Sequence, residues 1–155
     1  MRHLAHGVLS LGEGKPIEER LRLLHQGLVR ELAAHRPDVV AIEDVFHARN
    51  ARSALVLGQA RGVALLAAAQ SGARVRSYPP STIKQAVTGT GRAEKEQVAR
   101  MVAVLLGVSF AGRLDATDAL ATAICGILRA NDPQEAVAKA PRGDWRLALA
   151  RRYGK

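Results

Sequence analysis

The sequence predicts an α/β fold, a sheet flanked by helices, for this chain of 155 residues. Two short apolar runs, 38–43 and 73–78, have the length and composition of strands, and the longer segments around them repeat apolar residues at helical spacing. Strands that alternate with helices are typical of a sheet covered by helices. The length favours one domain with a proper hydrophobic core.

Composition and charge narrow the class of protein. The chain is 48% hydrophobic and 24% charged, with a net charge of +9 and a pI near 10.8. This balance favours a polyanionic partner, nucleic acid first and an anionic membrane surface second. We see no signal peptide and no apolar run of membrane-spanning length. Because the one cysteine, Cys125, fits a buried thiol in a reducing compartment, we expect a cytoplasmic protein.

The first half of the chain predicts four elements in order. Loose alternation predicts a strand over residues 3–10, and helical spacing predicts a helix over 16–36. The run 38–43 predicts a buried strand, and the segment rich in Leu, Val and Ala predicts a helix over 53–71. Gly58 and Gly62 lie four residues apart on that helix. They indicate a close approach of another backbone, from the sheet or from the same helix of a second copy.

The second half predicts one strand and three helices. The strand covers 73–78, a short helix follows to Val87, and Gly89-Thr90-Gly91 separates it from a helix that ends at Gly107. The last helix covers 114–130. Residues 132–155 hold three acidic and six basic side chains and predict a disordered basic tail after a domain of residues 1–131.

Carboxylates indicate where chemistry occurs. Glu43 ends the buried strand 38–43, at the position where open α/β sheets usually place their active sites, and Asp44 is expected to be its solvated neighbour. Asp115 and Asp118 lie three apart at the start of the last helix, hence on one face. They fit either acidic residues that favour the helix N-terminus or, with Glu43, ligands of a hard divalent cation such as Mg²⁺.

Basic and aromatic side chains accompany these carboxylates. Lys84 and Lys95 flank the Gly89-Thr90-Gly91 break, which suits either phosphate binding or a plain turn between two helices. Phe46 is a core residue or, with Arg49 and Arg52 nearby, a platform on which an unpaired base stacks.

Four blocks in this order and spacing, AIEDVFHARN, ALVLGQARG, IKQAVTGTGRAEKEQV and DATDALATAI, resemble the RuvC family of Holliday-junction resolvases. The resemblance covers residues 3 to 130. It implies a ribonuclease H-like mixed sheet and a homodimer that nicks four-way DNA junctions symmetrically with two Mg²⁺ or Mn²⁺ ions per site. It also implies work alongside a branch-migration helicase complex in recombination and repair.

By motif, the resemblance assigns metal binding to Glu43, Asp115 and Asp118, and contacts near the scissile phosphate to Lys84 and Lys95. It assigns junction stacking to Phe46, and the dimer contact to helix 53–71. Family members open with a strand that reads roughly Ile-Asp-Pro-Gly and carries the first catalytic acid. Nothing here matches that strand, so we expect a sheet whose first strand is missing, through a start assigned too far downstream or a truncated chain.

Two further hypotheses belong to other classes. A catalytically inactive protein that binds junction DNA through its basic face would explain the absent acid. An ATP-binding protein of the same broad fold would use Gly89-Thr90-Gly91 for phosphate, although a second phosphate loop is lacking.

Overall fold

Two parallel strands form the sheet in the part of the chain that the computed structural model describes, residues 1–44, 50–108 and 115–130. Strand β1 covers Val39–Glu43 and strand β2 covers Arg74–Tyr78. Val39 pairs with Arg74 at one end and Glu43 with Tyr78 at the other. Both strands therefore end at the same edge of the sheet, and Glu43 lies at that edge.

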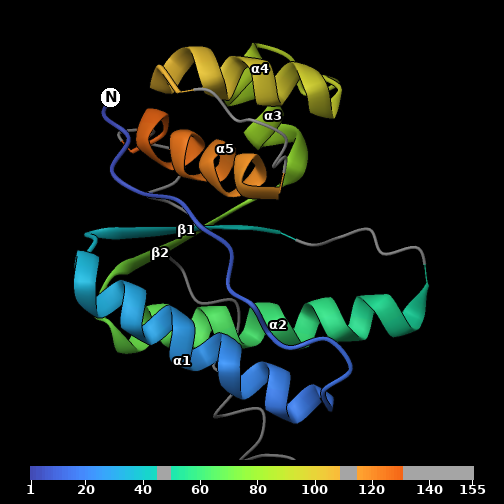
Figure 1. Ribbon diagram of the computed structural model, residues 1–155. Coiled ribbons are helices and arrows are strands. Elements are labelled where there is room, and N and C mark those ends of the chain that lie inside the picture. Colours follow the sequence, from blue (N-terminus) through green and yellow to red (C-terminus); the bar gives the residue numbers. More distant parts are fainter. Residues whose placement is uncertain (45–49, 109–114, 131–155) are drawn as a thin grey trace, which may run out of the picture.

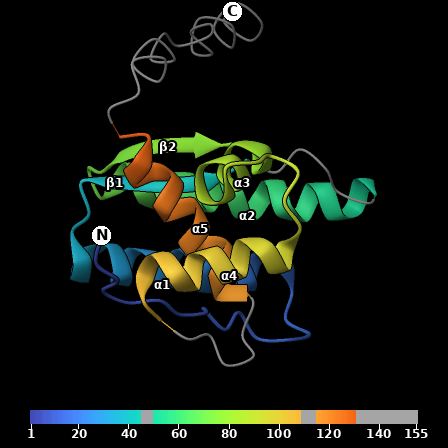
Figure 2. The same ribbon diagram turned by 90° about the horizontal axis from the view of Figure 1, so that it is seen from above.

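Five helices cover the two faces of this sheet within the described ranges (Figure 1). Helices α1 (Ile17–His35) and α2 (Ala51–Gln70) pack together below it. Helix α5 (Asp115–Leu128) packs on the other face, mainly against β1. Helices α3 (Pro80–Thr88) and α4 (Lys95–Leu106) pack on α5, which Figure 2 shows from above. From α1 onward, the predicted order of strands and helices is confirmed over the described residues.

The main core lies between the sheet and the three helices above it. Its buried side chains include Tyr78 from β2, Ile83 from α3, Val102 from α4 and Ile124 from α5. Gly126 brings α5 close to the sheet, since a Cβ atom at this position would lie 3.1 Å from the Cβ atom of Ala41. The core therefore fixes the first turn of α5 relative to the end of β1.

Local signals fix where α3 and α4 end and begin. Gly89 and Gly107 adopt left-handed backbone conformations at the carboxyl ends of α3 and α4. A capping box between Glu94 and Gln97 starts α4, so that Lys95 is its first residue. A Cβ atom on Gly91 would lie 3.2 Å from the Ser81 carbonyl oxygen. Gly89-Thr90-Gly91 is therefore a turn between two helices in which Gly91 packs closely on Ser81 at the start of α3, while Gly89 and Thr90 are exposed.

The strand expected over residues 3–10 is wrong for this structure. These residues form neither a helix nor a strand, and they precede α1 as an extended segment. Leu9 packs on the bare backbone of Gly27 in α1, where a Cβ atom would come within 2.9 Å of the leucine side chain. A strand needs a backbone partner, and no described strand pairs with this segment. The observed order therefore starts with a helix.

Replacing Gly126 with leucine should lower the free energy of unfolding by about 1–3 kcal/mol, because the side chain would be forced between α5 and β1. Ala123→Leu is the matched control, since Ala123 is exposed on the same helix and its replacement should change stability by less than about 0.5 kcal/mol. Urea denaturation measures both. Equal stability of the two variants would contradict the close packing of α5 on β1.

Candidate active site

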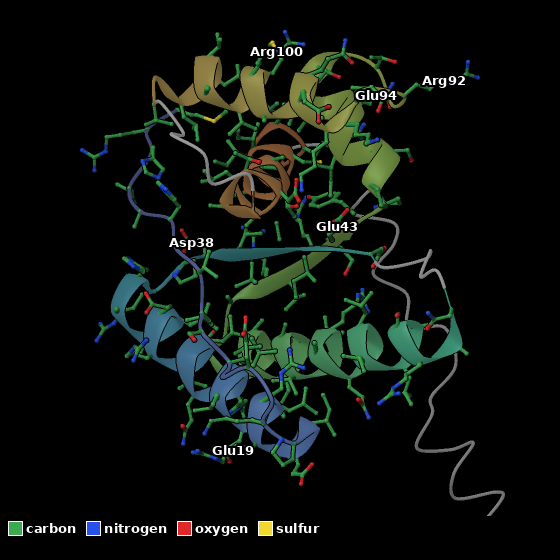
Figure 3. The ribbon with its side chains drawn as sticks, turned by 45° about the vertical axis from the view of Figure 1, so that its right-hand side comes forward. Glu19, Asp38, Glu43, Arg92, Glu94 and Arg100 are labelled. Carbon is green, nitrogen blue, oxygen red and sulfur yellow. The ribbon has the colours of Figure 1, made fainter. Side chains whose placement is uncertain are left out.

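The edge where β1 ends brings two carboxylates and two lysines together from four different elements. Glu43 ends β1, Lys84 lies on α3, Lys95 starts α4 and Asp118 lies in the first turn of α5. All four line one cavity of about 250 Å³. Figure 3 shows Glu43 at the end of β1 on the side of the upper helices. The parallel pairing and the packing of α5 thus assemble four predicted site residues.

Lys95 and Asp118 form an ion pair across this cavity. The lysine Nζ donates to the Oδ2 atom of Asp118 at 3.0 Å, and both side chains are half-exposed. The capping box at Glu94 and the core position of α5 hold the two residues in place from their own helices. A cation is therefore already favoured next to the Asp118 carboxylate.

Glu43 has the most perturbed environment in the cavity. Its carboxyl pKa is raised above the ordinary value, chiefly because the surrounding walls withdraw water from it and next because Asp118 carries the same charge. Lys84 and Lys95 act in the opposite direction. The residue as a whole stays accessible to solvent, so a ligand can reach it. Two like charges that face each other form a site where a bound cation would be stabilised.

Asp44 is not the solvated neighbour that the sequence suggested. Its carboxylate is only 18% exposed and forms an ion pair with Arg61 of α2. The same guanidinium donates to the Ser77 hydroxyl of β2 at 2.9 Å. Successive strand residues face opposite sides of a sheet, so Glu43 turns toward α5 and Asp44 toward α2. No sequence pattern singles out Arg61 as a site residue, although it lies inside the block ALVLGQARG.

Four predicted site residues are not brought into the cavity by the described structure. Phe46 and Arg49 lie outside the described residues, and so does the side chain of Asp115, whose backbone starts α5. Arg52 is exposed in the first turn of α2, beside Ser53. Thr122, which no sequence pattern singles out, lines the cavity one turn after Asp118.

A larger hollow, of about 710 Å³, lies elsewhere. It is found between the carboxyl ends of α1 and α2, where both strands begin, and Asp38 and Arg74 are among its lining residues. Figure 3 shows Asp38 at the opposite end of β1 from Glu43. Asp38 is the one carboxylate among the lining residues, so this hollow lacks the paired acids found at the edge where β1 ends.

The cavity suits a hard divalent cation in its donor chemistry. Glu43 and Asp118 supply carboxylate oxygens, the ligands that Mg²⁺ prefers. The described part of the chain contains no cluster of three or more potential metal-ligating side chains. Two protein carboxylates with open positions match Mg²⁺, which keeps waters and substrate phosphate oxygens in its shell.

A family model described as crossover junction endodeoxyribonuclease RuvC matches residues 1–126. The chain belongs to the RuvC family. RuvC of Trichlorobacter lovleyi is 50% identical over 125 residues, which are 81% of this chain and 70% of the relative. RuvC of Myxococcus xanthus is 52% identical over 125 residues, 79% of this chain and 65% of the relative.

Two solved structures of Thermus thermophilus RuvC share the fold at 37% sequence identity. One covers 83% of this chain and 78% of its own with a TM-score of 0.74. The other, in complex with a Holliday junction substrate, covers 83% and 79% with a TM-score of 0.77. The resemblance seen in the four sequence blocks is thereby confirmed, and RuvC membership implies a metal-dependent nuclease. Across the described ranges, no helix has the length and apolar character needed to span a membrane.

In metal-free protein, Glu43→Gln should increase the free energy of unfolding at pH 7.5. A carboxyl whose pKa is raised by folding favours the folded state below its unfolded pKa and loses that contribution as pH rises through its folded pKa. The advantage of glutamine should therefore shrink as pH falls and Glu43 takes up a proton. Urea denaturation with EDTA at several pH values measures this. A glutamine variant that is less stable at pH 7.5 would contradict the electrostatics described for the cavity.

Proposed function

We propose that this RuvC-family endonuclease resolves Holliday junctions by symmetric, metal-dependent nicking of two DNA strands in recombination and repair. The observation that carries the proposal is the convergence of Glu43, Asp118, Lys84 and Lys95 in one cavity. The family model, which describes a crossover junction endodeoxyribonuclease, supplies the substrate class. The catalytically inactive alternative has less support, because four site residues from separate elements still converge in that cavity. The ATP-binding alternative also has less support, since the sequence lacks a second phosphate loop and Gly91 packs closely on Ser81.

Mg²⁺ or Mn²⁺ is the proposed cofactor, with two ions per complete site. Glu43, Asp118 and, by its spacing on α5, Asp115 are the residues that would hold them. When bound, such ions make water a stronger nucleophile and stabilise the leaving 3′ oxygen. Because Lys95 already contacts Asp118, it would lie within reach of a phosphate bound through a metal ion at that carboxylate. Lys84 lies on the same cavity wall, and the two lysines would offset the charge that develops on the reacting phosphate.

A further strand beside β1 would complete the site. The edge of β1 away from β2 has no strand partner among the described residues. Next to it lies an apolar hollow of about 370 Å³, lined by Leu28, Leu32, Val40, Ile42, Ala64 and Ala119 together with Glu43 and Asp118. A strand in this hollow would satisfy the unpaired backbone groups at the edge of β1. A carboxylate near the end of that strand would join Glu43 and Asp118, which line the hollow. We propose that the family's first catalytic acid enters here, which would make the sheet ribonuclease H-like.

DNA is the proposed macromolecular partner. The net charge of +9 suits the phosphate backbone of a junction. Phe46, Arg49 and Arg52 follow the carboxyl end of β1 in sequence, and we propose that Phe46 stacks at the crossover while the arginines contact the backbone. The first-turn position of Arg52 on α2 suits this role. Lys84 and Lys95 would contact the junction at the cavity that they line.

A homodimer through α2 is proposed from its exposed outer face. Leu55, Gly58, Gly62 and Leu66 lie on one side of the helix, and both leucines are more than half exposed. A Cβ atom at either glycine would meet no described atom within 4 Å. Packing against the sheet therefore does not explain these glycines, and the second alternative, a helix of another copy, is favoured. A twofold dimer would present two equal sites to a four-way junction.

The remaining expectations stay predictions. They are a nuclease domain of residues 1–131, a basic tail of 132–155, a branch-migration helicase complex as partner and a cytoplasmic location. The buried thiol of Cys125 agrees with a reducing compartment.

Glu43→Gln or Asp118→Asn should abolish junction nicking while junction binding persists. The loss should exceed the roughly 10–100-fold effect of removing an outer-shell partner of a metal. Asp38→Asn removes a carboxylate from the opposite end of β1 and serves as the control with unchanged nicking. Nicking and gel-shift assays with Mg²⁺ should use this chain and a version extended by the family's Asp-Pro-Gly strand. Cleavage that survives either site substitution would overturn the ligand assignment.

Leu66→Glu should convert the dimer to a monomer, because twofold symmetry would bring the two added carboxylates close together at a tight helix contact. Val104→Glu is the charge-matched control, since Val104 is 73% exposed on α4, away from the proposed interface. Sedimentation velocity distinguishes the two states. A dimer that persists in Leu66→Glu would place the interface elsewhere.

A further inference from the structure

Arg61 connects three elements next to the active-site edge. From the third turn of α2, its Nη2 atom bonds to the Asp44 carboxylate, directly after β1, and to the Ser77 hydroxyl near the end of β2. The backbone amide of Asp44 also donates to the Tyr78 carbonyl at 2.8 Å. One guanidinium thus bridges the carboxyl ends of both strands on the α2 side of the sheet.

We propose that Arg61 is a positioning residue that holds the end of β1, and with it Glu43, in the geometry that binds metal. Glu43 and Asp44 are consecutive and face opposite sides of the sheet, so the side chain that fixes Asp44 also fixes the backbone that carries Glu43. This inference rests on the proposed metal-binding role of Glu43. Arg61 itself lies on the far side of the sheet from the cavity and does not line it.

The environment of Arg61 supports a held geometry. The Arg61 and Asp44 side chains are only 28% and 18% exposed, so their charges are screened less than those of surface ion pairs. The Nε atom of Arg61 is buried without a hydrogen-bond partner in the described structure. Burying such a donor is unfavourable, so the remaining contacts of the guanidinium must offset its cost. Lysine would carry the charge but not the planar fork of donors.

Hydrogen exchange of the Asp44 amide in metal-free protein directly tests whether Arg61 holds the end of β1. Arg61→Met should accelerate this exchange about tenfold or more, while the Ile124 amide in the core of α5, the reference for global unfolding, changes much less. Arg74→Met removes the same charge from the start of β2, where Arg74 is exposed, and should leave the Asp44 amide unchanged. Arg61→Lys should recover only part of the protection.

The Mn²⁺ dissociation constant, measured by electron paramagnetic resonance, tests the consequence for the metal site. Arg61→Met and Asp44→Asn should each weaken Mn²⁺ binding by about 10-fold or more, as outer-shell losses do. If Arg61→Met does not fold, Asp44→Asn and Ser77→Ala carry the same two measurements, with smaller changes in the same direction. Exchange and Mn²⁺ affinity within twofold of wild type, or equal acceleration at Asp44 and Ile124, would overturn the proposal.

Glu43→Gln separates this inference from the proposed function. If the metal role is correct, this variant loses Mn²⁺ binding while the protection of its Asp44 amide stays as in wild type. Unchanged Mn²⁺ binding in Glu43→Gln would instead refute the metal role of Glu43, whatever the exchange data show for Arg61.

Discussion

The parallel pairing of β1 with β2 is the constraint on which the rest of the structure depends. Because both strands run the same way, Glu43 and Tyr78 end at one edge, and the helices that follow each strand begin from that edge. Lys84 on α3 and Lys95 on α4 reach the cavity by this route. The close approach of α5 to β1 at Gly126 then sets Asp118 opposite Glu43.

The carboxylates of Glu43 and Asp118 lie together in this cavity, and the two lysines offset their repulsion only in part. The raised pKa of the Glu43 carboxyl reflects lost water first and the Asp118 charge second, against the effect of the two lysines. The two carboxylates are therefore more favourable with a divalent cation bound between them than without one, as a metal-dependent nuclease requires. Arg61 adds a second layer on the other face of the sheet, where a partly buried ion pair holds Asp44. Chemistry and support therefore occupy opposite faces of the same strand end.

Much of the fold could be predicted from sequence, and four of the residues predicted for the site line one cavity. Apolar periodicity identified both strands and all five described helices to within a few residues, because each buries an apolar face that imposes the period. Pairing is a non-local property, so the alternation in residues 3–10 could not reveal that no described strand pairs with them. The contact of Asp44 with Arg61 was missed for the same reason, since 17 residues separate the two.

The most direct test of the proposed metal site is to locate the position at which Mn²⁺ binds. In NMR spectra of the labelled chain, paramagnetic Mn²⁺ broadens the amide signals nearest to it. A metal ion in the cavity at the end of β1 should first broaden the signals of Glu43, Lys84, Lys95 and Asp118. Signals around Asp38 and Arg74 at the opposite end of the strands should stay sharp. Broadening that begins around Asp38, or that is uniform over the surface, would contradict a metal site at the carboxyl end of β1.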